Sequence, residues 1–238
     1  MERAGMRSAG RLLLEVLFPG RCLLCGQWLL LHGDHPAPVC GDCVGGLSPI
    51  LGERCVTCGM PLVSERGNCT RCRAAAFSFE SNIALFPYSG AARDLIGMLK
   101  FQGRRRLASL FADLAVRAMD GDRERLPVVP VPPRPGQSEP DAVERVARSL
   151  AQRHDRRVSR LLVRTGGAPQ KSLSLTERRE NLRGNIRIAP STRGSALPPR
   201  VLLLDDVFTT GATLDECART LREAGCSQVY ALTLAIEE

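Results

Sequence analysis

Near the C-terminus the sequence reads VLLLDDVFTTGATL, from Val201 to Leu214. Four aliphatic residues lead directly into two adjacent carboxylates, Asp205 and Asp206, and a run of small hydroxyl residues around Gly211 follows. In a parallel α/β sheet, ligands bind beyond the carboxyl ends of the strands. The stretch therefore predicts a buried strand, a ligand-binding loop and a helix, in that order.

The residue types of this loop predict a ligand that carries both a phosphate and a diol. Free backbone amides at the start of the next helix form a cradle for an anion, and threonine hydroxyls can add hydrogen bonds. Two neighbouring carboxylates would repel a phosphate, but they can accept hydrogen bonds from two vicinal hydroxyls. Both groups occur together in a ribose 5-phosphate. The simpler interpretation, an ordinary threonine cap, requires the strand, the paired acids and the TTGAT run to coincide by chance. The residues expected to bind are Asp205, Asp206, Thr209, Thr210, Gly211, Ala212 and Thr213.

The rest of the C-terminal two thirds predicts alternating strands and helices. Expected strands cover residues 77–88 (a strand or hairpin), 128–131, 158–163, 186–188, 201–204 and 228–234. Expected helices cover residues 91–101, 107–119, 141–154 and 211–224, with a charged helix or hood at 173–181. This alternation is typical of an α/β fold with a mainly parallel sheet flanked by helices. A short helix is also expected within residues 1–19, where Glu15 interrupts an apolar run and no cleavage site follows.

The cysteines predict a metal-binding module over residues 20–74. Eight of the ten cysteines fall in four CxxC pairs: Cys22 and Cys25, Cys40 and Cys43, Cys55 and Cys58, Cys69 and Cys72. A CxxC turn aims two thiolates at one tetrahedral ion, so four pairs predict two closed, structural zinc sites. The simplest pairing is sequential, because CxxCG opens each half of the module, and an interleaved pairing stays open. Disulfides are the alternative, but nothing points to secretion.

Charge and composition suggest an anionic partner. The formal net charge is +8, and residues 100–183 hold nineteen Lys/Arg against ten Asp/Glu. The alternative is a solvated, arginine-rich surface, which explains the tight run at 104–106 less well. Aromatic residues make up 4% of the chain, which argues against a base-stacking platform. No apolar run has the length of a membrane span, so we expect a cytoplasmic protein.

Taken together, these motifs resemble those of the ComF family, also called the competence-protein-F or GntX-like relatives of the amidophosphoribosyltransferases. The DDVFTTGAT loop is similar to the loop with which type I phosphoribosyltransferases bind phosphoribosyl pyrophosphate (PRPP). Three further segments match the family in order: LKFQG at 99–103, VVPVP at 128–132 and QKSLSLTERRENL at 170–182. The resemblance covers nearly the whole chain. It implies a type I phosphoribosyltransferase-like domain at 77–238, preceded by a double zinc ribbon.

The resemblance also implies a chemistry. Asp205 and Asp206 would be the catalytic residues, which hold the ribose and favour the positive charge that develops at its anomeric carbon. Magnesium would accompany PRPP. A lid over residues 164–181 would cover the pyrophosphate. Lys100 would either face the ligand or extend along the surface. The basic residues expected near the pyrophosphate are Arg134, Arg164, Lys171 and Arg178.

One departure from the family pattern leaves two functions open. After the VVPVP strand, relatives usually continue with an RGxNQ-like pyrophosphate loop, whereas residues 132–140 here read PPRPGQSEP. Glu139 would lie near a pyrophosphate. The first function is PRPP binding with transfer of the phosphoribosyl group to an unknown acceptor. The alternative is non-catalytic handling of single-stranded DNA in natural transformation, with a competence helicase as partner.

Overall fold

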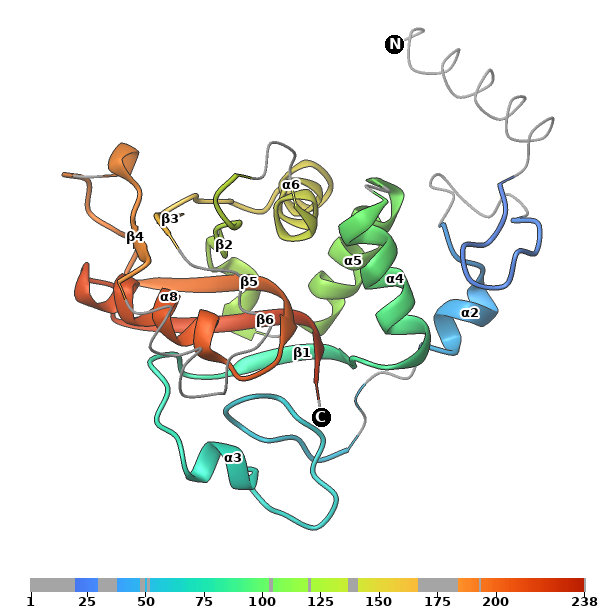
Figure 1. Ribbon diagram of the computed structural model, residues 1–238, viewed down its shortest axis with the longest axis horizontal. Coiled ribbons are helices and arrows are strands. Elements are labelled where there is room, and N and C mark those ends of the chain that lie inside the picture. The colour runs from blue at the N-terminus through green and yellow to red at the C-terminus, as the bar shows by residue number, and fades with distance from the viewer. Residues whose placement is uncertain are drawn as a thin grey trace, which may run out of the picture. The chain divides into compact units, whose positions relative to one another are not determined.

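The computed structural model describes residues 20–29, 38–47, 50, 52–102, 105–119, 121–136, 141–166, 184–192 and 194–237 (Figure 1). The chain divides into two compact units, Met1–Leu47 and Ser48–Glu238. The boundary falls between the second and third CxxC pairs, so the second cysteine quartet belongs to the same unit as the sheet. The helix expected within 1–19 and the segment expected at 173–181 lie outside the described residues.

The larger unit is built on a parallel sheet of four strands in the order β1-β6-β5-β2 (Figure 1). These strands are β1 (Asn82–Pro87), β2 (Val128–Pro130), β5 (Arg200–Phe208) and β6 (Gln228–Ile236), and every neighbouring pair is parallel. A separate antiparallel pair joins β3 (Leu162–Arg164) and β4 (Ile186–Ile188). The aliphatic runs of the central strands β5 and β6 are buried, as is typical of a parallel sheet that is covered on both faces. The predicted α/β fold with a mainly parallel sheet is confirmed.

The helices follow the predicted positions closely. They are α4 (Gly90–Phe101), α5 (Arg105–Ala118), α6 (Ala142–His154) and α8 (Ala212–Glu223), with short 3₁₀ turns at Gly121–Arg125 and Pro190–Thr192. Helices α4, α5 and α6 pack against one another and against the sheet, and α8 packs against β4, β5 and β6. Asp141 caps α6, since its Oδ1 accepts a hydrogen bond from the backbone N of Glu144 at 2.9 Å.

The second cysteine quartet is part of the hydrophobic core on one face of this sheet. Alternate residues of a strand point to opposite faces, and Val201 and Leu203 of β5 point to the same face. They share one buried cluster with Leu214 and Leu221 of α8 and with the four cysteines at 55, 58, 69 and 72. The second ribbon and α8 therefore both contribute to the core beside β5.

The strands differ from the predicted ranges at their ends. The sequence places the end of the strand that precedes the acids at Leu204, but β5 continues through both carboxylates to Phe208. The reason is its neighbour: β6 is equally long, and Asp205 pairs with Thr233 and Phe208 with Ile236. The strand expected at 158–163 begins only at Leu162, because Val158 makes a single bridge to β2.

Candidate ligand site and metal centres

The paired acids face a lysine that lies about a hundred residues earlier in the sequence. The Nζ atom of Lys100, in the last turn of α4, lies 2.9 Å from Oδ2 of Asp206, and both side chains are about a quarter exposed (27% and 26%). The sequence left open whether Lys100 faces the ligand or the solvent. The structure places its ammonium group at the acid pair, so this lysine belongs to the candidate site.

Asp205 is held in an environment that disfavours its charge. Burial, followed by the neighbouring Asp206 carboxylate, raises the pKa of Asp205 to about 8, although Lys100 works in the opposite direction. Asp141 lies close enough to contribute, and burial raises its own pKa as well. Hydroxyl donors or a cation at this cluster would stabilise the ionised carboxylates. The arrangement is therefore suited to a ligand that brings hydroxyl groups, a metal ion or both.

The loop after β5 forms the start of α8. Gly211 adopts a left-handed conformation with φ of 79°, and a Cβ atom there would lie 2.7 Å from Cζ of Phe208 and 2.8 Å from Cε1 of Phe77. Only glycine fits this position. The next residue, Ala212, begins a helix of twelve residues, and its backbone N donates to Oγ1 of Thr210 at 3.2 Å. Short side chains and free amides at the N-terminus of a helix form an anion-binding arrangement.

Two arginines lie near each other, and one of them, Arg164, also lies near Asp205. Arg134 follows β2 and is exposed, and Arg164 ends β3 and is partly buried. Burial, and then the charge of Arg134, lowers the pKa of Arg164, while Asp205 works in the opposite direction. The Nε atom of Arg164 is buried and makes no hydrogen bond within the part of the chain that the structure describes. An anion at this edge of the sheet would relieve the repulsion between the two guanidinium groups.

The structure brings together one contiguous part of the predicted site. Asp205, Asp206 and the loop 209–213 lie at the carboxyl end of β5 and the start of α8, with Arg134 and Arg164 nearby. Lys171 and Arg178 lie outside the described residues. The two cysteines outside the CxxC pairs, Cys217 and Cys226, are buried in the core.

The eight CxxC cysteines form two quartets, paired sequentially. One consists of Cys22, Cys25, Cys40 and Cys43, the other of Cys55, Cys58, Cys69 and Cys72, and within each quartet the sulfur atoms lie within 4.8 Å of one another. The sulfur atoms of Cys25 and Cys40 are 3.7 Å apart, and so are those of Cys58 and Cys69. A tetrahedral zinc site with Zn–S bonds of about 2.3 Å has edges of about 3.8 Å, whereas a disulfide needs about 2.05 Å. Both quartets therefore fit zinc.

Backbone amides support the thiolates in the same way in both quartets. The backbone N of Cys40 donates to Sγ of Cys22 at 3.3 Å, and that of Cys69 donates to Sγ of Cys55 at 3.4 Å. Burial alone would raise the pKa of Cys55, but hydrogen bonds from the amides of Cys58 and Cys69 lower it to about 7. Burial raises the pKa of Cys58 to about 12. A bound cation is what allows all four thiols of this quartet to ionise together.

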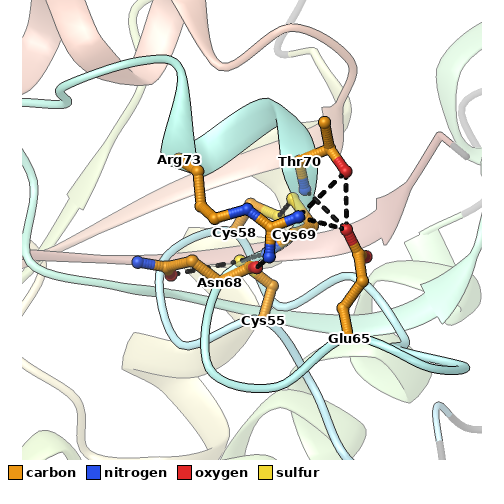
Figure 2. A network of polar contacts seen from close by, with 7 residues as sticks. All are labelled: Cys55, Cys58, Glu65, Asn68, Cys69, Thr70 and Arg73. Carbon is orange, nitrogen blue, oxygen red and sulfur yellow. Dashed lines mark hydrogen bonds and ion pairs between the residues drawn. The ribbon is translucent and has the colours of Figure 1, made fainter.

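A network of polar contacts lies beside the second cysteine quartet (Figure 2). Oε1 of Glu65 accepts hydrogen bonds from the backbone N and the hydroxyl of Thr70, at 2.9 and 2.6 Å, and lies 3.1 Å from Nη2 of Arg73. Arg73 also donates to the carbonyl oxygen of Asn68 at 3.0 Å. The network connects Glu65 with the first and last residues of the short helix α3 (Thr70–Arg73), which begins after Cys69 and contains Cys72.

Two residues that link the second ribbon to the sheet and the loop were missed at the level of sequence. Nδ2 of Asn82, in β1, donates to the carbonyl oxygen of Cys58 at 3.0 Å and to Oγ1 of Thr233 at 3.1 Å. Nη1 of Arg71 donates to the carbonyl oxygen of Thr209 at 2.6 Å. Arg71 occupies one of the two unspecified (x) positions of a CxxC pair, so no motif in the sequence pointed to it.

Comparison with known proteins identifies the family. The family model described as a double zinc ribbon domain matches residues 13–73. Competence protein F of Haemophilus influenzae is 30% identical over 195 residues, which cover 76% of this chain and 83% of the relative. The chain belongs to the ComF family.

Two further relatives extend the match to nearly the full length of this ComF-family protein. Competence protein ComFC of Streptococcus pneumoniae is 26% identical over 90% of this chain and 99% of its own. DNA utilization protein YhgH of Escherichia coli is 28% identical over 89% of this chain and 94% of its own. Among the described residues, no helix has both the length and the apolar character needed to cross a membrane.

Proposed function

We propose that this ComF-family protein binds PRPP with magnesium at the acid pair and the loop that follows it. The observation that carries the proposal is the acid pair itself, which is flanked by Lys100 and leads into the N-terminus of α8 at the carboxyl edge of a parallel sheet. The amides and hydroxyls of 209–213 would hold the 5-phosphate. Asp205 and Asp206 would accept hydrogen bonds from the two ribose hydroxyls.

The same residues support displacement of pyrophosphate. When the bond between the anomeric carbon and the pyrophosphate oxygen breaks, positive charge develops on the ribose, and the two carboxylates stabilise it. Arg134 and Arg164 would offset the charge of the departing pyrophosphate. Magnesium, when bound, supplies further neutralisation of that group. The acceptor that takes the phosphoribosyl group is not specified by any described residue, so the proposal is PRPP binding, with transfer as its chemical consequence.

Calorimetric titration of the zinc-loaded protein with PRPP and Mg²⁺ tests the proposal. We expect binding by the wild type and its loss in an Asp205→Ala/Asp206→Ala double variant. Asp94→Ala, which removes an exposed carboxylate from α4, is the control and should bind normally. Absence of heat with the wild type would remove the proposed site, and would point to the altered 132–140 loop as the cause.

A second candidate function is the handling of single-stranded DNA in the cytoplasm during natural transformation, with a competence helicase as partner. The names of the relatives favour it, since they are competence and DNA utilization proteins. The excess of basic residues at 100–183 supports it as well. The two functions are compatible in one protein. Binding of a single-stranded oligonucleotide at low salt that weakens steeply as salt rises would support this role, and no binding at low salt would exclude it.

A further inference from the structure

Helix α3, which begins after one zinc ligand and contains the next, contacts the candidate ligand loop. Arg71 lies between Cys69 and Cys72, and its Nη1 donates a hydrogen bond of 2.6 Å to the carbonyl oxygen of Thr209, 138 positions away. The contact is partly buried, and the donor carries a charge. Hydrogen bonds of this kind are about twice as strong as neutral ones. Arg71 therefore holds the first residue of the loop from the side of the zinc ribbon.

The segment that leaves the ribbon holds the other end of the loop. Phe77 packs against Phe208, with ring centroids 6.3 Å apart, and these two rings enclose Gly211. The backbone N of Ser78 donates to Oδ1 of Asp215, in the first turn of α8, at 2.7 Å. The segment from 209 to 215, which comprises the loop and the first turn of α8, is thus fixed at its start, its middle and its end by residues that follow or belong to the second ribbon.

Zinc determines where Arg71 lies. Helix α3 has four residues, too few to be stable alone, and the cysteines on either side of Arg71 are ligands of the same ion. Without the ion, no bond would tie Cys69 and Cys72 to the other two cysteines of the quartet. The position of the Arg71 guanidinium, and with it the carbonyl of Thr209, depends on an intact second site.

We propose that Arg71 is a positioning residue for the phosphate-binding loop, and that it couples the second zinc site to ligand binding. The ligand part of this inference rests on the proposed PRPP function. Because coupling between two sites is reciprocal, bound PRPP should raise the zinc affinity of the second quartet and leave that of the first quartet unaffected. We expect the higher affinity to appear as slower release of zinc from the second quartet. The second ribbon thereby supports the loop of the ligand site through Arg71.

The chain offers a matched pair of variants. Arg71→Gln removes the contact with the loop, whereas Arg73→Gln, on the same helix, removes a contact with Glu65 inside the ribbon (Figure 2). Both variants should retain two zinc ions per chain. We expect Arg71→Gln to weaken PRPP binding about tenfold in calorimetry, with partial rescue by Arg71→Lys, and Arg73→Gln to change it less than about twofold.

Zinc release to a colorimetric chelator gives a readout that does not depend on turnover. With the wild type we expect two kinetic phases, one of which is slowed by PRPP and Mg²⁺. In Arg71→Gln this protection should be lost. Equal PRPP affinity in the wild type and Arg71→Gln, or equal protection of both phases, would overturn the coupling.

Hydrogen exchange separates this inference from the proposed function. In the ligand-free, zinc-loaded protein, Arg71→Gln should speed exchange of the amides at 209–213, and Arg73→Gln should not. Unchanged exchange in Arg71→Gln overturns the positioning role even if PRPP binds. Faster exchange in Arg71→Gln, together with a wild type that binds no PRPP, would support positioning by Arg71 while removing the proposed ligand.

Discussion

The two cysteine quartets have similar backbone conformations but differ in their surroundings. In each, the backbone N of the first cysteine donates to a carbonyl five residues later, at 2.8 Å, and the glycine after the CxxC turn has a positive φ, 72° at Gly26 and 77° at Gly59. A short helix follows the third cysteine in both. Yet Cys25 is exposed, while Cys58 is completely buried. The same zinc-binding unit forms part of a separate compact unit in one place and part of a domain core in the other.

The residue before each ribbon illustrates the difference. Arg21 and Arg54 each precede the first cysteine of a quartet. Arg21 stacks on Trp28, 4.2 Å from the ring centroid, and that tryptophan is 56% exposed. Arg54 instead donates to the carbonyl oxygens of Ala84, in β1, and of Ile50. Burial lowers the pKa of Arg54. What distinguishes the ribbons is therefore the set of contacts outside the zinc ligands, and three pairs of variants test it.

The largest difference is expected from the loss of a zinc ligand. Cys58→Ser should lower the free energy of unfolding of the larger unit by more than about 4 kcal/mol, because it removes metal binding from a buried core. Cys25→Ser should release the first zinc and leave that unfolding transition within about 0.5 kcal/mol of the wild type. Denaturant unfolding followed by circular dichroism, with zinc counted per chain, makes the measurement. Equal losses from the two variants would contradict the comparison.

The glycines give the next largest difference. A Cβ atom at Gly59 would lie 2.6 Å from the carbonyl oxygen of Asn82, whereas one at Gly26 would meet nothing within 4 Å. Gly26→Ala should cost about 1 kcal/mol for its positive φ alone. Gly59→Ala adds a clash with backbone and should cost more than about 3 kcal/mol. The measurement is thermal unfolding of the two variants with zinc in excess. A cost below about 1.5 kcal/mol for Gly59→Ala would show that the backbone of β1 shifts easily to make room for the added Cβ atom.

Smaller effects should follow from the paired arginines. Arg54→Met keeps the apolar stem but removes two hydrogen bonds to backbone, and should cost about 2 kcal/mol. Arg21→Met removes an exposed cation–π contact and should cost about 0.5 kcal/mol. Chemical denaturation can resolve this difference. If Arg21→Met cost as much as Arg54→Met, the first ribbon would be as strongly tied to its surroundings as the second.

The smallest effect is a pH dependence confined to the unit that holds the second ribbon. The raised pKa of Asp205 means that the folded state keeps a proton that the unfolded chain has released, from about pH 4 up to about pH 8. The free energy of unfolding should therefore fall as pH rises through this window. Since Asp205 is only partly buried, we expect a total effect of about 1 kcal/mol.

Asp205→Asn should remove this decline. Denaturation of wild type and variant at about pH 6 and about pH 9, with zinc present, measures it. Asp94→Asn serves as the control for loss of an exposed carboxylate. A decline that persists in Asp205→Asn would assign it to another group.

Much of this architecture follows from local sequence. The helices α4, α5, α6 and α8 begin and end within two residues of the predicted bounds, because apolar periodicity and glycine positions are local signals. The strand ends were less predictable. The sequence of β5 alone does not show that it extends past its acids, since the extra length comes from pairing with β6. The location of Lys100 beside Asp206 was likewise left open.

By itself, the sequence determined the eight zinc ligands, the order of strands and helices, and the strand–loop–helix that carries the acid pair. Spacing and periodicity suffice for these features, because each depends on residues close together in the chain. Tertiary structure alone decided that the quartets pair sequentially, that the second is built into the core beside β5, and that Arg71 reaches Thr209. Such contacts depend on how elements far apart in the chain pack together, and the local sequence around each residue does not determine this packing.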